Sequence, residues 1–164
     1  MDEEQRLTVH EWHRRTAAEL FNFVWSLLEK DHRTKEEDDA MLHAAHASRF
    51  HWSKVGTAVN LARGDWQLSR VYSVLRRAEP ALYHAGRCLE ICQENVMGDF
   101  DLAFAYEALA RASAVAGKSV DAQKYLDFAR HSGKKIADHE DREWLFSNLA
   151  TISGFDQSVS RAGR

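Results

Sequence analysis

The chain has 164 residues, a length that suits one domain. Its 22 basic and 25 acidic residues give a formal net charge of -3, which excludes a general attraction to nucleic acid or anionic lipid. One proline and eight glycines leave few breaks and favour helix over strand. No stretch approaches the roughly 18 apolar residues of a membrane span, so we expect a cytoplasmic protein that binds neither nucleic acid nor membrane.

Two helices are predicted in the first third of the chain. Thr8 and Glu11 have the spacing of a capping box, and apolar residues then recur with helical period to about residue 30. Thr34 and Glu37 form a second capping box ahead of a helix over residues 35–54.

Five further helices are predicted before residue 153. Gly56 and Thr57 break the chain ahead of a third helix, and Pro80 suits the first turn of a fourth that ends near residue 95. The caps expected for the last three are Asp99 for residues 101–116, Ser119 for residues up to about 131, and Asp138 for a seventh helix. Residues 153–164 are small and polar and are expected to form a flexible tail, so residues 1–152 are expected to form one helical domain.

The sequence resembles itself at a constant interval, which we call the repeat interval and which separates Leu27 from Leu68 and Leu68 from Leu109. Stacked helical hairpins require such recurrence, because each hairpin meets its neighbour at the same close-packed positions. We therefore predict an all-α fold of seven helices in stacked antiparallel hairpins, with the seventh as a C-terminal capping helix. The other recurring sets are Ala40, Ala81 and Ala122; Ala47, Cys88 and Ala129; Trp25 and Trp66; and His43 and His84.

The second hairpin resembles a tetratricopeptide repeat (TPR). Leu68, Tyr72, Ala81 and Cys88 match the leucine, the aromatic and the two later small residues of that family. The repeat interval is longer than the family's period of about 34 residues, which we attribute to longer helices and links. The resemblance implies an α-solenoid that binds peptides or proteins in a concave groove, lined by the first helix of each hairpin.

One face of the third helix carries the candidate ligand contacts, and a shift by one repeat interval carries the pattern to the fifth helix. Arginine suits carboxylate or phosphate, and tryptophan adds a flat apolar contact, so this stripe indicates a groove for an acidic peptide or anionic ligand. The alternative is a solvated face with internal ion pairs, such as Arg70 with Glu107. The candidate ligand-binding residues are Arg63, Trp66, Arg70, Phe104, Glu107 and Arg111.

Histidines supply the alternative function. His43 and His46 share a helical face with Asp39, and together with His84 they suggest a divalent-metal site or a catalytic acid or base tuned by Asp39 or Arg87. The established helical metal signatures are absent, so satisfied or surface histidines are favoured.

Two cysteines lie four residues apart and are expected to be reduced core thiols. Cys88 and Cys92 follow His84 with helical spacing, so a soft-metal site is the alternative interpretation.

The leading hypothesis is therefore a TPR-like interaction module for an acidic protein or peptide partner, with no cofactor predicted. The alternative is a small helical metal-dependent or ligand-transforming protein. An enzyme is not favoured because no nucleophile motif or phosphate loop is present. The sequence does not indicate an oligomeric state.

Overall fold

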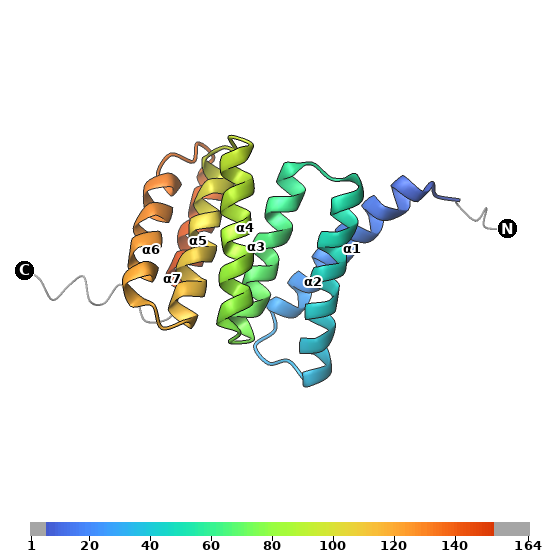
Figure 1. The fold of residues 1–164 in the computed structure, drawn as a ribbon, viewed down its shortest axis with the longest axis horizontal. Coiled ribbons are helices and arrows are strands. Elements are labelled where there is room, and N and C mark those ends of the chain that lie inside the picture. The colour runs from blue at the N-terminus through green and yellow to red at the C-terminus, as the bar shows by residue number, and fades with distance from the viewer. Residues whose placement is uncertain (1–5, 153–164) are drawn as a thin grey trace, which may run out of the picture.

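The computed structural model describes residues 6–152, and every regular element in this range is an α-helix. The helices pack in successive pairs, α1 with α2, α3 with α4 and α5 with α6, with α7 against α5 and α6 (Figure 1). This confirms the predicted all-α fold. The tail expected over residues 153–164 lies outside the described residues. The helices are α1 (Val9–Leu28), α2 (Lys35–Val55), α3 (Ala58–Val74), α4 (Ala78–Glu94), α5 (Asp99–Val115), α6 (Ser119–Gly133) and α7 (His139–Ala150).

Local capping explains where several helices begin. The capping boxes of α1 and α2 are both present: Thr8 and Thr34 each accept a hydrogen bond from a backbone N–H three residues later. Asp138 caps α7 in the same manner. The caps predicted for α5 and α6 are each displaced by one residue. Asp99 and Ser119 are the first helical residues there, and the preceding Gly98 and Lys118 occupy the N-cap without a side-chain cap.

The repeat interval is present in the helix boundaries. A shift by one interval carries both ends of α3 onto those of α5, and the start of α4 onto the start of α6. The turns repeat as well, since Arg76 after α3 and Gly117 after α5 both have positive φ, of 61° and 73°. Another shift from Asp99 falls one residue after the start of α7, so α7 is the first helix of a fourth unit.

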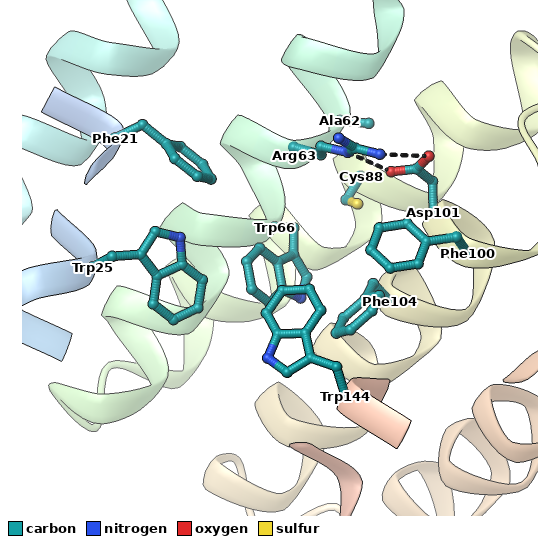
Figure 2. A pocket seen from close by; sticks show the side chains of 10 residues that line it. All are labelled: Phe21, Trp25, Ala62, Arg63, Trp66, Cys88, Phe100, Asp101, Phe104 and Trp144. Carbon is teal, nitrogen blue, oxygen red and sulfur yellow. Dashed lines mark hydrogen bonds and ion pairs between the residues drawn. The ribbon is translucent and has the colours of Figure 1, made fainter. Parts of the chain in front are cut away.

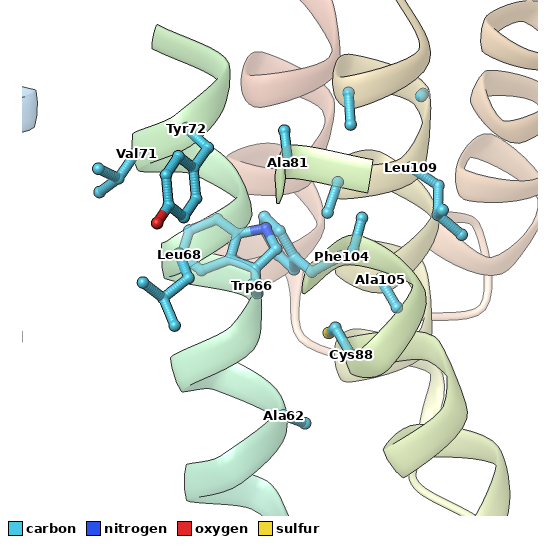
Figure 3. Packing of buried hydrophobic residues seen from close by; sticks show 14 of the residues in the cluster. Ala62, Trp66, Leu68, Val71, Tyr72, Ala81, Cys88, Phe104, Ala105 and Leu109 are labelled. Atoms are coloured by element: carbon cyan, nitrogen blue, oxygen red, sulfur yellow. The ribbon is translucent and has the colours of Figure 1, made fainter. Parts of the chain in front are cut away.

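Small buried side chains let the helices approach closely. Ala81 on α4 and Ala122 on α6 are completely buried at equivalent positions. Ser69 on α3 donates a hydrogen bond to the Ala81 carbonyl oxygen at 2.9 Å, which joins the two helices of that hairpin. Figure 3 shows Ala81 and Cys88 of α4 facing the layer that contains Trp66 and Phe104. Cys88 and Cys92 are buried free thiols, which agrees with the core role predicted for them.

Among the helices between residues 6 and 152, none has the combination of length and hydropathy that a membrane span needs.

Candidate functional site

The stripe predicted as a surface is mostly covered in the folded chain. Trp66 and Phe104 are 5% exposed, and Glu107 is 1% exposed. Trp144 of α7 packs on Phe104 and Trp66, with ring centroids 4.7 and 6.2 Å apart. The expectation of an open arginine and tryptophan groove is therefore wrong in its geometry, because α7 lies over the part of α3 and α5 that carries these residues.

Glu107 is the centre of a buried polar network. Its carboxylate accepts hydrogen bonds from Trp66 Nε1 at 3.0 Å, from Arg70 Nη1 at 3.0 Å and from Arg111 Nε at 2.8 Å. The ion pair between Arg70 and Glu107, proposed from the sequence as the alternative to a ligand contact, is thus present. Trp66 and Glu107 are one repeat interval apart in the sequence, so neighbouring units join at this bond.

The same arginines fasten α7 to the stack. Arg70 Nη2 donates to Asn148 Oδ1 at 2.6 Å, and Arg111 Nη2 donates to the Asn148 carbonyl oxygen at 2.9 Å and to Thr151 Oγ1 at 2.8 Å. Asn148 lies one further interval after Glu107. The equivalent positions of the four units are thus Trp25, Trp66, Glu107 and Asn148. We call the face that these four residues share the inner face.

Two guanidinium groups share one carboxylate in this network. Burial raises the pKa of Glu107, but nearby Arg111 and Arg70 outweigh it, so the net shift is downward and the carboxylate is ionised. Burial lowers the pKa of Arg70, and Glu107 opposes that change while Arg111 adds to it. Arg70, Glu107 and Arg111 thus carry one net positive charge in a place with little access to water.

Beside this network is a cavity of about 150 Å³ walled by aromatic rings, which we call the aromatic pocket. Trp25 of α1 and Trp66 of α3 have ring centroids 5.3 Å apart, and the Trp144 ring of α7 lies beside both of them, 6.4 Å from Trp25 and 6.2 Å from Trp66 (Figure 2). The aromatic walls come from α1, α3, α5 and α7, so one helix of every unit contributes. The aromatic residues that line it are Phe21, Trp25, Trp66, Phe100, Phe104 and Trp144.

The charged group at the aromatic pocket is an ion pair between α3 and α5. Arg63 binds Asp101 through two bonds, from Nε to Oδ1 at 2.8 Å and from Nη2 to Oδ2 at 3.3 Å. The Arg63 guanidinium also lies over the Phe100 ring, 5.3 Å from its centroid. Because the Arg63 side chain is 49% exposed, it is the arginine of the predicted stripe that is most accessible to a ligand.

The histidines of the alternative site are partly brought together. His84 Nδ1 lies 2.8 Å from Asp65 Oδ1, and His46 Nε2 lies 2.7 Å from the Tyr72 hydroxyl oxygen. Burial and neighbouring His84 lower the pKa of His46. His43 is exposed, and no bond from it to His46 or His84 is present in the described part of the chain. Within residues 6–152, no group of three or more histidine, cysteine or acidic side chains has an arrangement that could hold a metal ion.

Several residues of these sites were missed in the sequence, among them Asp65, Trp144 and Asn148. Asp65 is buried between His84 and Arg49, whose Nε donates to Asp65 Oδ2 at 2.9 Å, and it contacts His84 in the place expected for Asp39 or Arg87. Trp144 and Asn148 were expected only as part of a capping helix. The signal for Asn148 was available, since the line from Trp25 through Trp66 and Glu107 continues to it at the same interval.

Comparisons of the chain with protein-family models, with curated proteins and with solved structures find no match.

Proposed function

We propose that this protein is an interaction module that binds a segment of a partner protein on its inner face, with one apolar side chain of the partner in the aromatic pocket. The observation that carries the proposal is the aromatic pocket itself. A cavity of about 150 Å³ lined by apolar groups is large enough for a benzene-sized ligand, which is the size of one phenylalanine or leucine side chain. Rigid aromatic walls bury much area while losing little side-chain entropy.

The size of the pocket favours a peptide over a free small molecule. Burying one side chain gains about 1.5–3 kcal/mol, whereas a dissociation constant of 1 mM already requires about 4.1 kcal/mol. A ligand that fills only the aromatic pocket would therefore bind too weakly to be useful. A partner segment adds contacts beyond the pocket, and the Arg63 guanidinium, whose side chain is half exposed, offers it hydrogen-bond donors.

The proposal keeps the peptide partner expected from the TPR resemblance and changes the residues that hold it. Arg70 and Arg111 form hydrogen bonds with Glu107 and with α7. These bonds stabilise the packing of the helices beside the aromatic pocket. Trp66 and Phe104 stay in the site as walls, and Arg63 stays as its accessible charge. The acidic character of the partner stays a prediction.

The histidine alternative has less support. The hydrogen bond that His84 Nδ1 donates to Asp65 would orient a catalytic base, but His84 does not line the aromatic pocket. A metal-dependent function stays a prediction, and elemental analysis of the purified protein tests it.

The experiment fills the pocket without removing any contact. Ala62 lines the pocket and is 1% exposed, so the larger side chain in Ala62→Leu should occupy the free volume and block binding. Overpacking at a buried alanine costs about 1–3 kcal/mol, so far-UV circular dichroism and the urea midpoint of Ala62→Leu are compared with wild type to check that the variant is folded. Indole is the probe, followed through the tryptophan indole N–H signals in ¹H–¹⁵N spectra. We expect concentration-dependent shifts in the wild type, with a dissociation constant above about 1 mM because only one pocket is filled. The shifts should be lost in Ala62→Leu and kept in Ala150→Leu, which makes the same change at an exposed position of α7.

A selection of displayed random peptides then tests the class of partner. We expect wild type to enrich peptides with a large apolar anchor and Ala62→Leu to enrich none of them. Equal indole binding by wild type and Ala62→Leu would contradict the pocket, and equal enrichment would contradict the peptide function.

A further inference from the structure

A second cavity lies on the inner face, beyond the arginine network from the aromatic pocket. Its volume is about 330 Å³, and its walls come from the C-terminal ends of α3 and α5 and from Ile152 after α7. The polar residues in its walls are Ser73, Arg76 and Arg111, and the others are aliphatic. Both cavities are thus bordered by α3, α5 and the chain of the fourth unit, and along α3 the residues that line them lie before and after Arg70, which binds Asn148.

The charge around the second cavity is not balanced. Arg111 and Arg70 share the single carboxylate of Glu107. Among the described residues, Arg76 has no ion-pair partner, and the bonds of Arg111 engage only its Nε and Nη2 atoms. The C-terminal ends of α3 and α5 each add about half a negative charge. Their sum is smaller than the positive charge of Arg76 plus the net positive charge of the buried Arg70, Glu107 and Arg111 network.

Ser73 adds a polar group that lacks a partner. Its side chain is buried in the wall of the cavity, and its hydroxyl group has no hydrogen-bond partner within residues 6–152. A buried hydroxyl is normally satisfied. Rotation about χ1 moves a serine hydroxyl between staggered positions, and the hydroxyl can donate from each of them. Ser73 can therefore turn its hydroxyl group toward a ligand that brings an acceptor oxygen.

We propose that the second cavity is a carboxylate subsite, which binds an acidic group of the same partner segment that places its apolar side chain in the aromatic pocket. This inference rests on the proposed function and makes it more specific. Arg111 Nη1, Arg76 and the Ser73 hydroxyl group are the donors, and Val74 and Ile152 contact the aliphatic part of the acidic residue. A carboxylate accepts several such bonds, and charged acceptors make the strongest ones.

The distance between the cavities predicts the spacing in the ligand. Trp66 and Ser73 line different cavities and are seven residues apart on α3, which is about 10 Å at 1.5 Å per residue. An extended peptide covers about 10 Å in three residues. The partner should therefore carry an acidic residue three positions from its apolar anchor.

The subsite is tested first without a peptide. Acetate is titrated into the full chain and compared with acetamide, which has the same shape and no charge, while the Arg111 Nε–H signal and the backbone amides of Ser73 and Val115 are followed. We expect saturable shifts with acetate alone. Arg76→Gln and Ser73→Ala should each weaken acetate binding about tenfold, the factor that 1.4 kcal/mol represents for one charge-assisted hydrogen bond. Arg87→Gln, on the exposed face of α4, should not change it. Equal shifts with acetamide, or no effect of Arg76→Gln and Ser73→Ala, would overturn the subsite.

Matched peptides test the spacing. Four-residue peptides with Trp at one end and Glu at the other, in both chain directions, are compared with the same peptides carrying Gln in place of Glu. We expect at least one Glu peptide to bind ten or more times more tightly than its Gln partner, with the gain lost in Arg76→Gln. If Glu and Gln peptides bind equally and Ala62→Leu abolishes both, the carboxylate subsite is wrong and the aromatic pocket stands. If none binds and indole does not bind either, the proposed function itself is wrong.

Discussion

Replacing Glu107 by Gln should be among the most damaging isosteric changes in this chain. The substitution preserves shape but leaves Arg70 and Arg111, whose side chains are 13% and 12% exposed, without their shared carboxylate. Removing one partner of a buried ion pair costs about 3–5 kcal/mol, because a charge stays buried without compensation. The free energy of unfolding of a domain is about 5–15 kcal/mol, so Glu107→Gln should remove a large fraction of it.

Urea denaturation followed by far-UV circular dichroism measures this effect. With a slope of about 2 kcal/mol per molar urea, the midpoint should fall by roughly 1.5–2.5 M. Asp101→Asn is the control, because it breaks an ion pair whose Arg63 partner is half exposed, and such a pair contributes about 1 kcal/mol or less. Equal losses for Glu107→Gln and Asp101→Asn would refute the reasoning that burial makes the Glu107 network essential.

Three further changes have expected outcomes. Because the pKa of Glu107 is lowered by folding, its contribution is complete at neutral pH and is lost as pH falls from the ordinary glutamate range through the lowered pKa; urea midpoints measured against pH should fall less steeply in Glu107→Gln than in wild type. Replacing Ala81 or Ala122 by Leu should lower the free energy of unfolding by about 1–3 kcal/mol through overpacking, and unchanged melting temperatures for both would mean that the helices do not meet there. Val96 is 90% exposed with a φ of 48°, which strains a β-branched residue, so Val96→Asn should raise the free energy of unfolding by about 0.5–1 kcal/mol; a drop in thermal stability would argue against strain.

The elements that depend on local chemistry could be predicted from the sequence. Thr8 and Thr34 begin their helices as predicted because a capping box lies within four residues of the chain. The repeat interval identified Ala81 and Ala122 as contact positions, since close approach of two helices excludes larger side chains at each repetition. Asp99 and Ser119 were misplaced by one residue, because both also stabilise a first helical turn from inside it.

The burial of the candidate site could not be predicted in the same way. Helical periodicity separates a strongly apolar line from a polar one, and Arg70, Glu107 and Arg111 follow the polar line of their helices. Whether such a line faces water depends on what covers it, and here the cover is α7, a helix of another unit. Charged residues are seldom buried unless they are paired, and only the repeat interval, which leads from Trp66 through Glu107 to Asn148, pointed to the residue that completes the pairing.

The contact between Trp25 and Trp144, with ring centroids 6.4 Å apart, joins the first unit to the fourth. In an open linear array each unit contacts only its neighbours, so units can be added or deleted and the ends can unfold independently. The Trp25–Trp144 contact passes over the two units between them and couples the ends of this array to each other. Inserting a unit between α4 and α5 would move Trp144 away from Trp25 and break that contact. Because the first and fourth units are coupled, the described helices should unfold in a single transition.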